Sequence, residues 1–425
     1  MTKHYPVIIY KRDEKKVYSS DFQTQATYAD GWKAILSSAH RYEYPITCAC
    51  PGNHSRSLSV RYITDGDSYY LARYPKSGEQ HAFDCRYYSP DPNKTGLSGY
   101  HSDVVEEKSN GDISVKLNLS LRINELPDSG EPVAVRQANS DAKYATKPAM
   151  TLLGLLNLIW TEAGLNVWSP NFAKKKRTVS FIHSRLVRTA SRITTNHMRL
   201  NEALVVSTPE SGGRQEEANI AKVKSATRNK RRLLIIAPLA SYNEERASGV
   251  KGFLAVKYPN GLPLITYDQA LWSAVSKRYS RQLSAWGKGQ TIVAIVQADQ
   301  PSNENKAKAL NIAIMVVSSE WIPVDSSYES IVEKKLRDEG RHFYKPLRFD
   351  SENEVVFPDF WLLDLPDNRE FPMEVFGMDS SEYIERKHEK VEHYNSVYGA
   401  KGWWMWDVTI DRNGVETAPL PAPKH

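Results

Sequence analysis

Apolar and polar residues alternate along the chain with two periods, which separate predicted strands from predicted helices. In the N-terminal part, residues 28–39 have helical spacing. Residues 58–62 and 69–73 alternate on either side of an Asp-Gly-Asp sequence, which is typical of a β-hairpin. Residues 113–121 carry an apolar side chain at every second position. We therefore expect a β-rich N-terminal module over residues 1–146.

The middle of the chain changes to helix-like spacing. Residues 151–163 place leucine and isoleucine on one helical face and are followed by Gly164, a common helix stop. Two further apolar-periodic segments follow, residues 179–193 and 198–204. We expect the three segments to form a compact helical, winged-helix-like unit over residues 147–206.

Residues 207–232 contain Pro209, two glycines and many charges, and this composition predicts a flexible linker. Beyond it, a helix at residues 267–285 is surrounded by strand-like runs, which indicates an α/β scaffold over residues 233–321. The predicted strands are residues 233–238, 252–256, 262–265, 291–297 and 309–317.

Two apolar runs near the C-terminus, residues 360–365 and 371–376, are separated by a turn-forming Pro-Asp-Asn sequence and predict another hairpin. A turn centred in that sequence places Asp359 opposite Phe376 and puts Glu374 on the same face as Asp359. Diagonal neighbours of this kind lie about 7–8 Å apart at Cα. Two carboxylates at that distance are able to hold one divalent cation.

Predicted helices lie on both sides of this hairpin. Residues 328–336 place Glu329 and Glu333 on the apolar face of the first helix. The second helix, residues 381–397, lacks internal proline and glycine. One stripe of it combines aromatic and basic side chains: Tyr383, Lys387, Lys390 and Tyr394. The aromatic residues 403–407 predict a closing core strand.

The composition is that of a soluble globular protein, with 40% hydrophobic and 25% charged residues. A chain of 425 residues exceeds one ordinary core, so we expect about two to four domains. The chain contains no run of about 18 apolar residues and starts without a signal-peptide core, which predicts a cytoplasmic protein with no membrane partner. A net charge of +6 permits nucleic-acid binding without requiring it.

All three cysteines lie around the first predicted hairpin. Cys48 and Cys50 precede it, whereas His81 and Cys85 follow it. Because a hairpin brings its ends together, the two pairs are able to meet as three sulfurs and one nitrogen, a set that suits a closed, structural Zn²⁺ site. The alternatives are a disulfide between Cys85 and either other cysteine, three unrelated buried thiols, or His54 as the ligand in place of His81.

Basic residues interleave with the apolar positions of residues 179–193. Arg185, Arg188 and Arg192 are spaced by three and four residues, so they form one stripe along a helix. Such a stripe is able to follow the phosphates of DNA. A solvated helix face is the alternative, and the basic clusters at residues 174–177 and 228–232 leave the same choice open.

The C-terminal pattern resembles the PD-(D/E)xK nuclease superfamily, whose core is a helix with an acidic residue, a metal-binding hairpin, a second helix and a further strand. Pro358 and Asp359 match the first half of the motif, and Glu374 matches its second acid. Phe376 stands where the family has lysine. In some members that lysine has moved to the second helix, and the resemblance makes Lys387 its candidate.

The resemblance implies a restriction-endonuclease-like core over residues 322–425 and an endonuclease that depends on Mg²⁺ or Mn²⁺ and cleaves DNA. Asp359, Glu374 and the carbonyl of Val375 would hold the metal, and Lys387 would orient water or stabilise the phosphate.

Further residues complete this interpretation. Glu329 resembles the acid that the superfamily carries on its first helix, with Glu333 as the alternative. Tyr383 or Lys390 is a candidate contact to the DNA backbone.

Several stretches also resemble an uncharacterised bacterial family encoded on conjugative plasmids and integrative elements. They are residues 48–51, 70–75, 81–85, 152–168 and 357–390. This resemblance implies a mobile-element setting. The expected fold is a multidomain α+β and α/β chain, and the alternative function is a catalytically inactive nuclease-fold protein that binds nucleic acid as an accessory factor.

Overall fold

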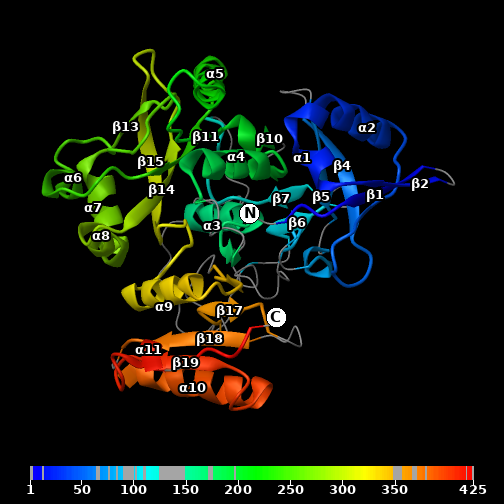
Figure 1. The fold of residues 1–425 in the computed structure, drawn as a ribbon. Helices are drawn as coiled ribbons and strands as arrows, with labels where there is room; N and C mark the ends of the chain where they lie inside the picture. The colour runs from blue at the N-terminus through cyan, green and yellow to red at the C-terminus, as the bar shows by residue number, and fades with distance from the viewer. Residues whose placement is uncertain are drawn as a thin grey trace.

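The chain forms a mixed α+β fold with four β-sheets. The structure is a computed structural model, which describes residues 3–11, 14–63, 68–74, 77–82, 85–89, 100, 103–108, 112–123, 149–170, 176–195, 198–347, 357–365, 371–378, 381–417 and 419–423. Figure 1 shows the N-terminal sheet at one side of the molecule and the C-terminal sheet below the central region.

The N-terminal sheet is antiparallel and has the strand order β2-β1-β3-β4-β5. Its strands are β1 (Val7–Lys11), β2 (Glu14–Tyr18), β3 (Ile46–Cys48), β4 (Ser57–Ile63) and β5 (Ser68–Arg73). A short helix, α1 (Ser20–Thr24), precedes helix α2 (Ala29–Arg41), which packs on β4 and β5. The predicted helix and the paired strands of the first hairpin are confirmed, and the predicted turn lies outside the described residues.

The central region combines helices with a four-stranded sheet of order β10-β9-β7-β6. Helices α3 (Leu152–Glu162) and α4 (Val179–Ala190) correspond to the first two predicted helical segments. The strands are β6 (Val105–Glu107), β7 (Ile113–Val115), β9 (Ile193–Thr195) and β10 (Met198–Arg199).

The third predicted helical segment differs from expectation, because it begins in the β9–β10 hairpin and ends in strand β11 (Leu204–Val206). Strand β9, which comes just before this segment and pairs with β10, consists of Ile193, Thr194 and Thr195. All three are β-branched and favour extended backbone. The central region is therefore not an all-helical unit.

Residues 207–232, predicted as a linker, contain helix α5 (Arg214–Arg228). No proline or glycine interrupts this helix, and its buried residues Asn219, Val223 and Ala226 are spaced by four and three. The Asn219 side-chain amide donates a hydrogen bond of 2.8 Å to the carbonyl of Val206 in β11. The charges that suggested a linker therefore belong to the polar face of an amphipathic helix.

A second five-stranded sheet has the order β11-β12-β14-β15-β13. Its further strands are β12 (Leu233–Pro238), β13 (Leu264–Thr266), β14 (Thr291–Ala298) and β15 (Lys306–Val317). The helices of this region are α6 (Glu244–Ser248), α7 (Gln269–Arg278) and α8 (Ser280–Gly287). The predicted helix at residues 267–285 is thus divided at Tyr279, and predicted strand 252–256 forms only isolated bridges.

One hydrophobic cluster extends from Tyr100 to Leu347 through both of these sheets. It includes Leu155 of α3, Leu186 of α4 and Ile295 of β14. The residues assigned from sequence to a helical unit and to a separate scaffold therefore share one core.

The C-terminal sheet has the order β19-β18-β17-β16-β8. Its strands are β8 (Val167–Trp168), β16 (Phe343–Tyr344), β17 (Phe360–Leu362), β18 (Phe371–Phe376) and β19 (Trp404–Asp407). Helices α9 (Ser327–Asp338) and α10 (Ser381–Tyr398) lie on opposite sides of it in Figure 1, and α11 (Gly414–Thr417) follows β19. Strands β18 and β19 are parallel, and α10 connects them.

The register of β17 against β18 differs from the predicted register. Phe360 pairs with Met373, whereas the predicted register would pair it with Val375. The Asp359 N–H donates to the Met373 carbonyl at 2.9 Å. The paired part of β17 ends at Leu362, and the predicted turn lies outside the described residues. With this two-residue shift, Asp359 contacts Met373 and Val375, the two neighbours of Glu374 in β18.

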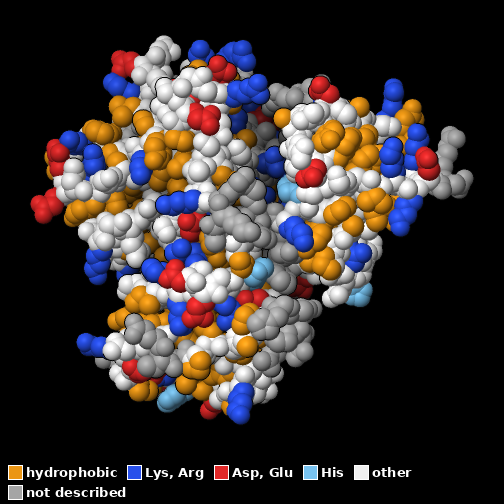
Figure 2. All heavy atoms as spheres, in the orientation of Figure 1, with side chains coloured by type: hydrophobic (Ala, Val, Ile, Leu, Met, Phe, Trp, Pro, Cys, Tyr) orange, Lys and Arg blue, Asp and Glu red, His pale blue; other side chains and the backbone are white. Residues whose placement is uncertain are grey.

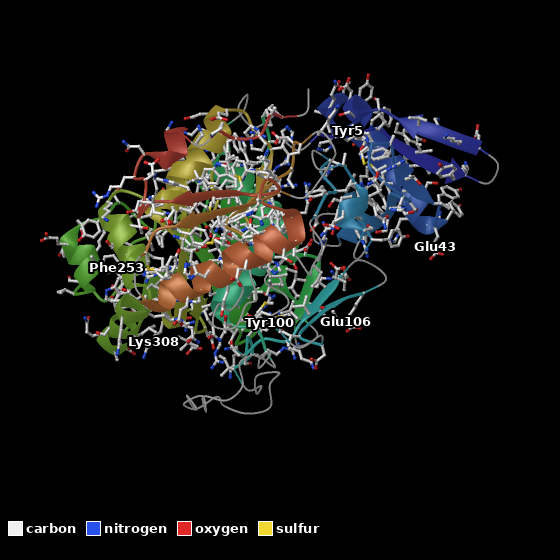
Figure 3. The ribbon with its side chains drawn as sticks, turned by 90° about the horizontal axis from the view of Figure 1, so that it is seen from below. Tyr5, Glu43, Tyr100, Glu106, Phe253 and Lys308 are labelled. Atoms are coloured by element: carbon white, nitrogen blue, oxygen red, sulfur yellow. The ribbon has the colours of Figure 1, made fainter. Side chains whose placement is uncertain are left out.

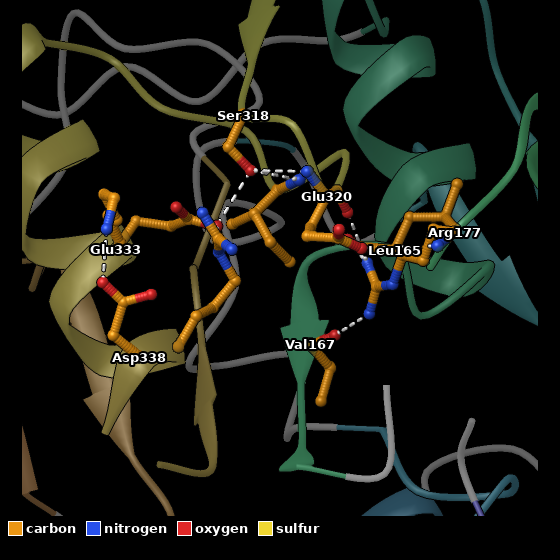
Figure 4. A network of polar contacts seen from close by, with 10 residues as sticks. Leu165, Val167, Arg177, Ser318, Glu320, Glu333 and Asp338 are labelled. Carbon is orange, nitrogen blue, oxygen red and sulfur yellow. Dashed lines mark hydrogen bonds and ion pairs between the residues drawn. The ribbon is translucent and has the colours of Figure 1, made fainter. Parts of the chain in front are cut away.

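Arg177 joins the central region to the C-terminal sheet (Figure 4). Its guanidinium donates to the carbonyls of Leu165 at 2.8 Å and Glu320 at 3.3 Å, and to that of Val167 in β8. Burial lowers the pKa of Arg177 to about 9. Arg177 belongs to the basic cluster at residues 174–177. Because it is buried and bonded to backbone carbonyls, it stabilises the fold and is not exposed to bind phosphate.

The surface carries charges of both signs. On the face shown in Figure 2, the described Lys and Arg side chains are mixed with acidic ones and form no continuous basic band. Seen from below, the module carrying Tyr5 and Glu43 lies across the molecule from the region carrying Phe253 and Lys308 (Figure 3). Within the described residues, no helix combines the length and apolarity needed to cross a membrane.

Candidate functional site

Three thiols and one imidazole meet beside the N-terminal sheet. Cys48 ends β3 and Cys50 lies two residues further on, while His81 and Cys85 follow a 3₁₀ turn at Gly78–Gln80. One ligand atom from each of the four residues lies within 4.8 Å of the others, and all four residues are buried. The predicted ligand set is therefore assembled as a group able to hold a metal ion.

The distances within this group fit a tetrahedral ion. The sulfurs of Cys48 and Cys85 are 3.7 Å apart. The His81 Nδ1 atom lies 3.5 Å from the Cys50 sulfur and 3.7 Å from that of Cys85. With metal–sulfur bonds of about 2.3 Å and metal–nitrogen bonds of about 2.0–2.1 Å, a tetrahedron separates two sulfurs by about 3.8 Å and sulfur from nitrogen by about 3.5 Å.

The backbone around the ligands is held close together. A Cβ atom at Gly52 would lie 2.1 Å from the Gln80 carbonyl oxygen, so only glycine allows the two ligand-bearing loops to cross here. The Ala82 N–H donates to the Cys50 sulfur at 3.4 Å. Arg56 donates to the Cys48 carbonyl at 3.1 Å and to that of Gly52. The loops therefore place the four ligands by backbone contacts.

Hydrogen bonds among the three thiols shift their pKa values in opposite directions. Hydrogen bonding from Cys48, and then from Cys85, lowers the pKa of Cys50. Hydrogen bonding with Cys50 raises the pKa of Cys48 to about 11, and hydrogen bonding with Cys48 raises the pKa of Cys85. One thiolate, the form that binds metals, is thus already favoured. All three cysteines are free of disulfides, and the alternative ligand His54 is exposed.

Asp359 lies just before β17 and contacts the segment of β18 that carries Glu374. The Asp359 Oδ2 atom accepts the Val375 N–H at 2.8 Å. The Glu374 Oε1 atom accepts from the Lys390 ammonium at 2.7 Å and from the Tyr394 hydroxyl at 2.9 Å. Within the described part of the chain, nothing donates to Asp359 Oδ1 or Glu374 Oε2, so each carboxylate keeps one oxygen for a cation.

The two acids interact electrostatically. Burial raises the pKa of Glu374 to about 7, the charge of Asp359 raises it further, and Lys390 opposes the shift. Glu374 is 1% exposed and Asp359 is 9% exposed, so water screens their repulsion poorly. A divalent cation between them would relieve this repulsion.

Lys387 does not supply the cation beside Glu374. It forms an ion pair with Asp407 of β19, and its ammonium lies 5.5 Å from the centre of the Phe376 ring. Lys390, predicted as a contact to the DNA backbone, holds Glu374 instead and donates to the Phe357 carbonyl at 3.2 Å. Because of the way α10 crosses the sheet, Lys390 contacts Glu374, whereas Lys387 contacts Asp407.

Glu329 of α9 belongs to the same charge cluster as Asp359. Burial raises the pKa of Glu329 to about 8, Lys345 opposes this shift, and Asp359 adds to it. Its Oε2 atom lies 2.8 Å from the Lys345 ammonium, which is also 3.0 Å from Asp325. Burial disfavours the charge of Lys345, but the three surrounding acids more than offset this and raise its pKa.

Glu333, the alternative acid of α9, has different partners. It pairs with Arg337 at 2.7 Å and accepts from the Ser318 hydroxyl at 2.8 Å (Figure 4). These contacts assign Glu333 to the packing of α9 against the end of β15, and leave Glu329 as the helix acid nearest the hairpin.

The three arginines predicted to follow DNA line a pocket. Burial lowers the pKa of Arg185 to about 9. Arg192 lies 2.9 Å from Glu162, which also pairs with Arg73 of β5 at 2.8 Å. Arg188 lines the same pocket. The arginine stripe thus lines the pocket between α4 and the N-terminal module, where Arg188 keeps an exposed side chain and Arg192 already has an acidic partner.

Two functional candidates received no role from the sequence. Lys345 follows Phe343 and Tyr344 within an apolar run, and a lysine in such a run signals a buried charge that needs acidic partners. Tyr394 belonged to the predicted aromatic and basic stripe, and its spacing of four from Lys390 puts both on the Glu374 side of α10.

Comparisons with known proteins give one family. A model of the family described as "Protein of unknown function (DUF1173)" matches residues 18–409, a range that includes both clusters above. No curated protein matches the chain.

Proposed function

The chain belongs to the DUF1173 family of proteins of unknown function, and we propose that its C-terminal region is a metal-dependent nuclease that cleaves DNA phosphodiester bonds. The order of α9, the β16–β17–β18 strands, α10 and β19 supports this proposal, because it resembles the helix, hairpin, helix and strand of the PD-(D/E)xK core. Asp359 immediately precedes β17 and Glu374 lies within β18, where that motif has its acids.

We base the proposal on one observation, the placement of Asp359 against the segment of β18 that carries Glu374. Each contributes a carboxylate oxygen to which no described residue donates a hydrogen bond. The N–H of Val375 points to Asp359, and the N–H and C=O of a strand residue leave on the same edge, so the Val375 carbonyl also faces this side. Oxygen ligands of this kind suit Mg²⁺ or Mn²⁺. Such an ion, when bound, lowers the pKa of a coordinated water and neutralises charge on a phosphate.

Lys390 takes the part that the resemblance gave to Lys387. Its ammonium is anchored on Glu374 and on the Phe357 carbonyl, so it is fixed beside Glu374. A fixed ammonium next to a reacting phosphate stabilises the negative charge that develops there. Lys345 and Glu329 act behind Asp359, where they set the charge of the buried cluster.

For the second cluster, we propose that Cys48, Cys50, His81 and Cys85 hold a structural Zn²⁺. Three sulfurs and one nitrogen complete a tetrahedron, which leaves no position for a substrate. The site would fix the loops beside the N-terminal sheet and take no part in cleavage.

A plasmid-nicking assay with Mg²⁺ or Mn²⁺ tests the nuclease proposal. We expect Asp359→Asn and Lys390→Met each to lower the rate by about 10²–10³-fold, because the first removes a charged metal ligand and the second removes positive charge at the reacting phosphate. Lys387→Met is the matched control, since it removes a lysine of the same helix that pairs with Asp407; we expect its rate to stay within a few-fold of wild type.

The ion pair of Lys390 with Glu374 also favours a second candidate, a nuclease-fold protein that binds nucleic acid without cutting it. In that case the pair only fastens α10 to β18. Background nicking by wild type and all variants, together with retained DNA binding, would establish this second function and exclude the first.

A further inference from the structure

A pocket lies where the N-terminal module meets the central helices and the C-terminal sheet. It is lined from three sides, by β5 and the segment after Cys85, by the end of α3 and β8, and by α4. Its charged lining consists of five arginines and a single acid: Arg73, Arg86, Arg185, Arg188, Arg192 and Glu162.

Glu162 forms ion pairs with two of these arginines. It lies 2.8 Å from Arg73 and 2.9 Å from Arg192. Burial opposes its charge, but the two guanidinium groups lower its pKa, so it remains a carboxylate. Arg73 and Arg192 therefore share one acid, and the other three arginines lack a carboxylate within the described lining.

Those three arginines raise the local positive potential. Arg86 contacts His4 at 3.2 Å, and burial followed by the charges of Arg86, Arg185 and Arg188 lowers the pKa of His4 to about 3. His4 is therefore a neutral imidazole near pH 7 and does not offset the charge of the arginines. The buried Nε atom of Arg185 has no hydrogen-bond partner in the described structure. Packed cations with unused donors require an anion to be stable.

We propose that this pocket binds a terminal phosphate, that is, a phosphomonoester. Guanidinium groups bind phosphate oxygens in pairs, and a phosphomonoester offers three oxygens with a charge of about −1.5 to −2. Three arginines match that charge better than the single charge of a phosphodiester inside a strand. The pocket thus favours the end of a nucleic-acid strand or a small phosphorylated molecule.

The proposal does not depend on nuclease activity, because Asp359 and Glu374 are not part of the pocket lining. Thermal unfolding of the full chain gives the first test. Sodium phosphate should raise the melting temperature more than sodium chloride at equal ionic strength. Equal shifts with the two salts would overturn the proposal.

Fluorescence anisotropy with single-stranded oligonucleotides gives the second test. We expect a 5′-phosphorylated oligonucleotide to bind about tenfold more tightly than its 5′-hydroxyl form, as the loss of one charge-assisted contact would predict. The Arg185→Gln and Arg188→Gln double variant should lose this difference, and Arg281→Gln, which removes an exposed charge in α8, should keep it.

The results also separate the two sources of the phosphate. Competition by adenosine monophosphate, with equal affinity for both oligonucleotides, assigns the pocket to a small phosphomonoester. Arg86→Gln provides a second variant on a different segment if the double variant does not fold. Unchanged phosphate stabilisation in a folded Arg86→Gln or double variant would contradict the assignment.

Discussion

At the scale of single residues, Glu374 has the most consequential environment. Its carboxyl group is buried between a lysine, a tyrosine and the carboxylate of Asp359. Burial and Asp359 together raise its pKa to about 7, so the protonated and ionised forms are both populated near neutral pH. Since only the ionised form binds a cation, metal affinity at this site should rise as pH increases through 7.

The same pKa predicts how stability depends on pH. Between pH 4.5 and about 7 the folded protein holds a proton on Glu374 that the unfolded chain releases, so stability falls as pH rises through this window. Glu374→Gln imitates the protonated acid and should remove this fall, which is on the order of 3 kcal/mol. Urea unfolding at pH 5 and pH 8 measures it. A constant stability difference between variant and wild type at both pH values would contradict the prediction.

At the scale of elements, the sequence predicted those helices and strands that are determined by their own residues and do not depend on packing against other elements. Helix α10 and strand β12 were expected within one residue of their observed ends, because the absence of proline and glycine indicated the first and an apolar run indicated the second. Helix α5 was missed because charges on its polar face outnumber its buried residues. The choice between Lys387 and Lys390 depends on how α10 crosses the sheet, which is tertiary information and absent from the spacing.

The stability of the C-terminal sheet depends on a buried ion pair. Arg341 binds Asp364 through two hydrogen bonds of 2.9 and 2.8 Å, and the two side chains are 2% and 7% exposed. Arg341→Ala would leave Asp364 buried without its partner and should cost about 3–5 kcal/mol of unfolding free energy. Lys334→Ala breaks the exposed pair with Asp338 and should cost about 0–1 kcal/mol. Comparable losses in both variants, measured by urea unfolding, would contradict this account.

At the scale of the whole molecule, three large hydrophobic clusters divide the chain. One belongs to the N-terminal module and includes all three cysteines, one spans the central sheets, and one fills the C-terminal sheet. Strand β8 couples the last two, because it follows α3 in the chain and pairs with β16. The sequence indicated the outer clusters, but not this exchange of a strand, since residues 167 and 168 are too few to show a pattern.

Metal removal should therefore affect one part of the molecule. We expect about one zinc ion per purified chain, and its extraction by a strong chelator should unfold the N-terminal module, whose core contains the ligands. Calorimetry should show an early transition that moves down in temperature while the main transition stays in place. Absence of zinc with three freely titrating thiols, or an unchanged unfolding profile after chelation, would refute the zinc site.

The central claim is that Asp359 and Glu374 hold a hard divalent cation. Manganese binding at pH 8, followed by electron paramagnetic resonance of the free ion, tests it most directly, because the Cys and His set is a poor ligand for Mn²⁺. We predict that wild type binds one ion per chain and that Asp359→Asn and Glu374→Gln each lose it, while Lys387→Met retains it. Equal binding by wild type and both acid variants, or no binding by wild type, would contradict the claim.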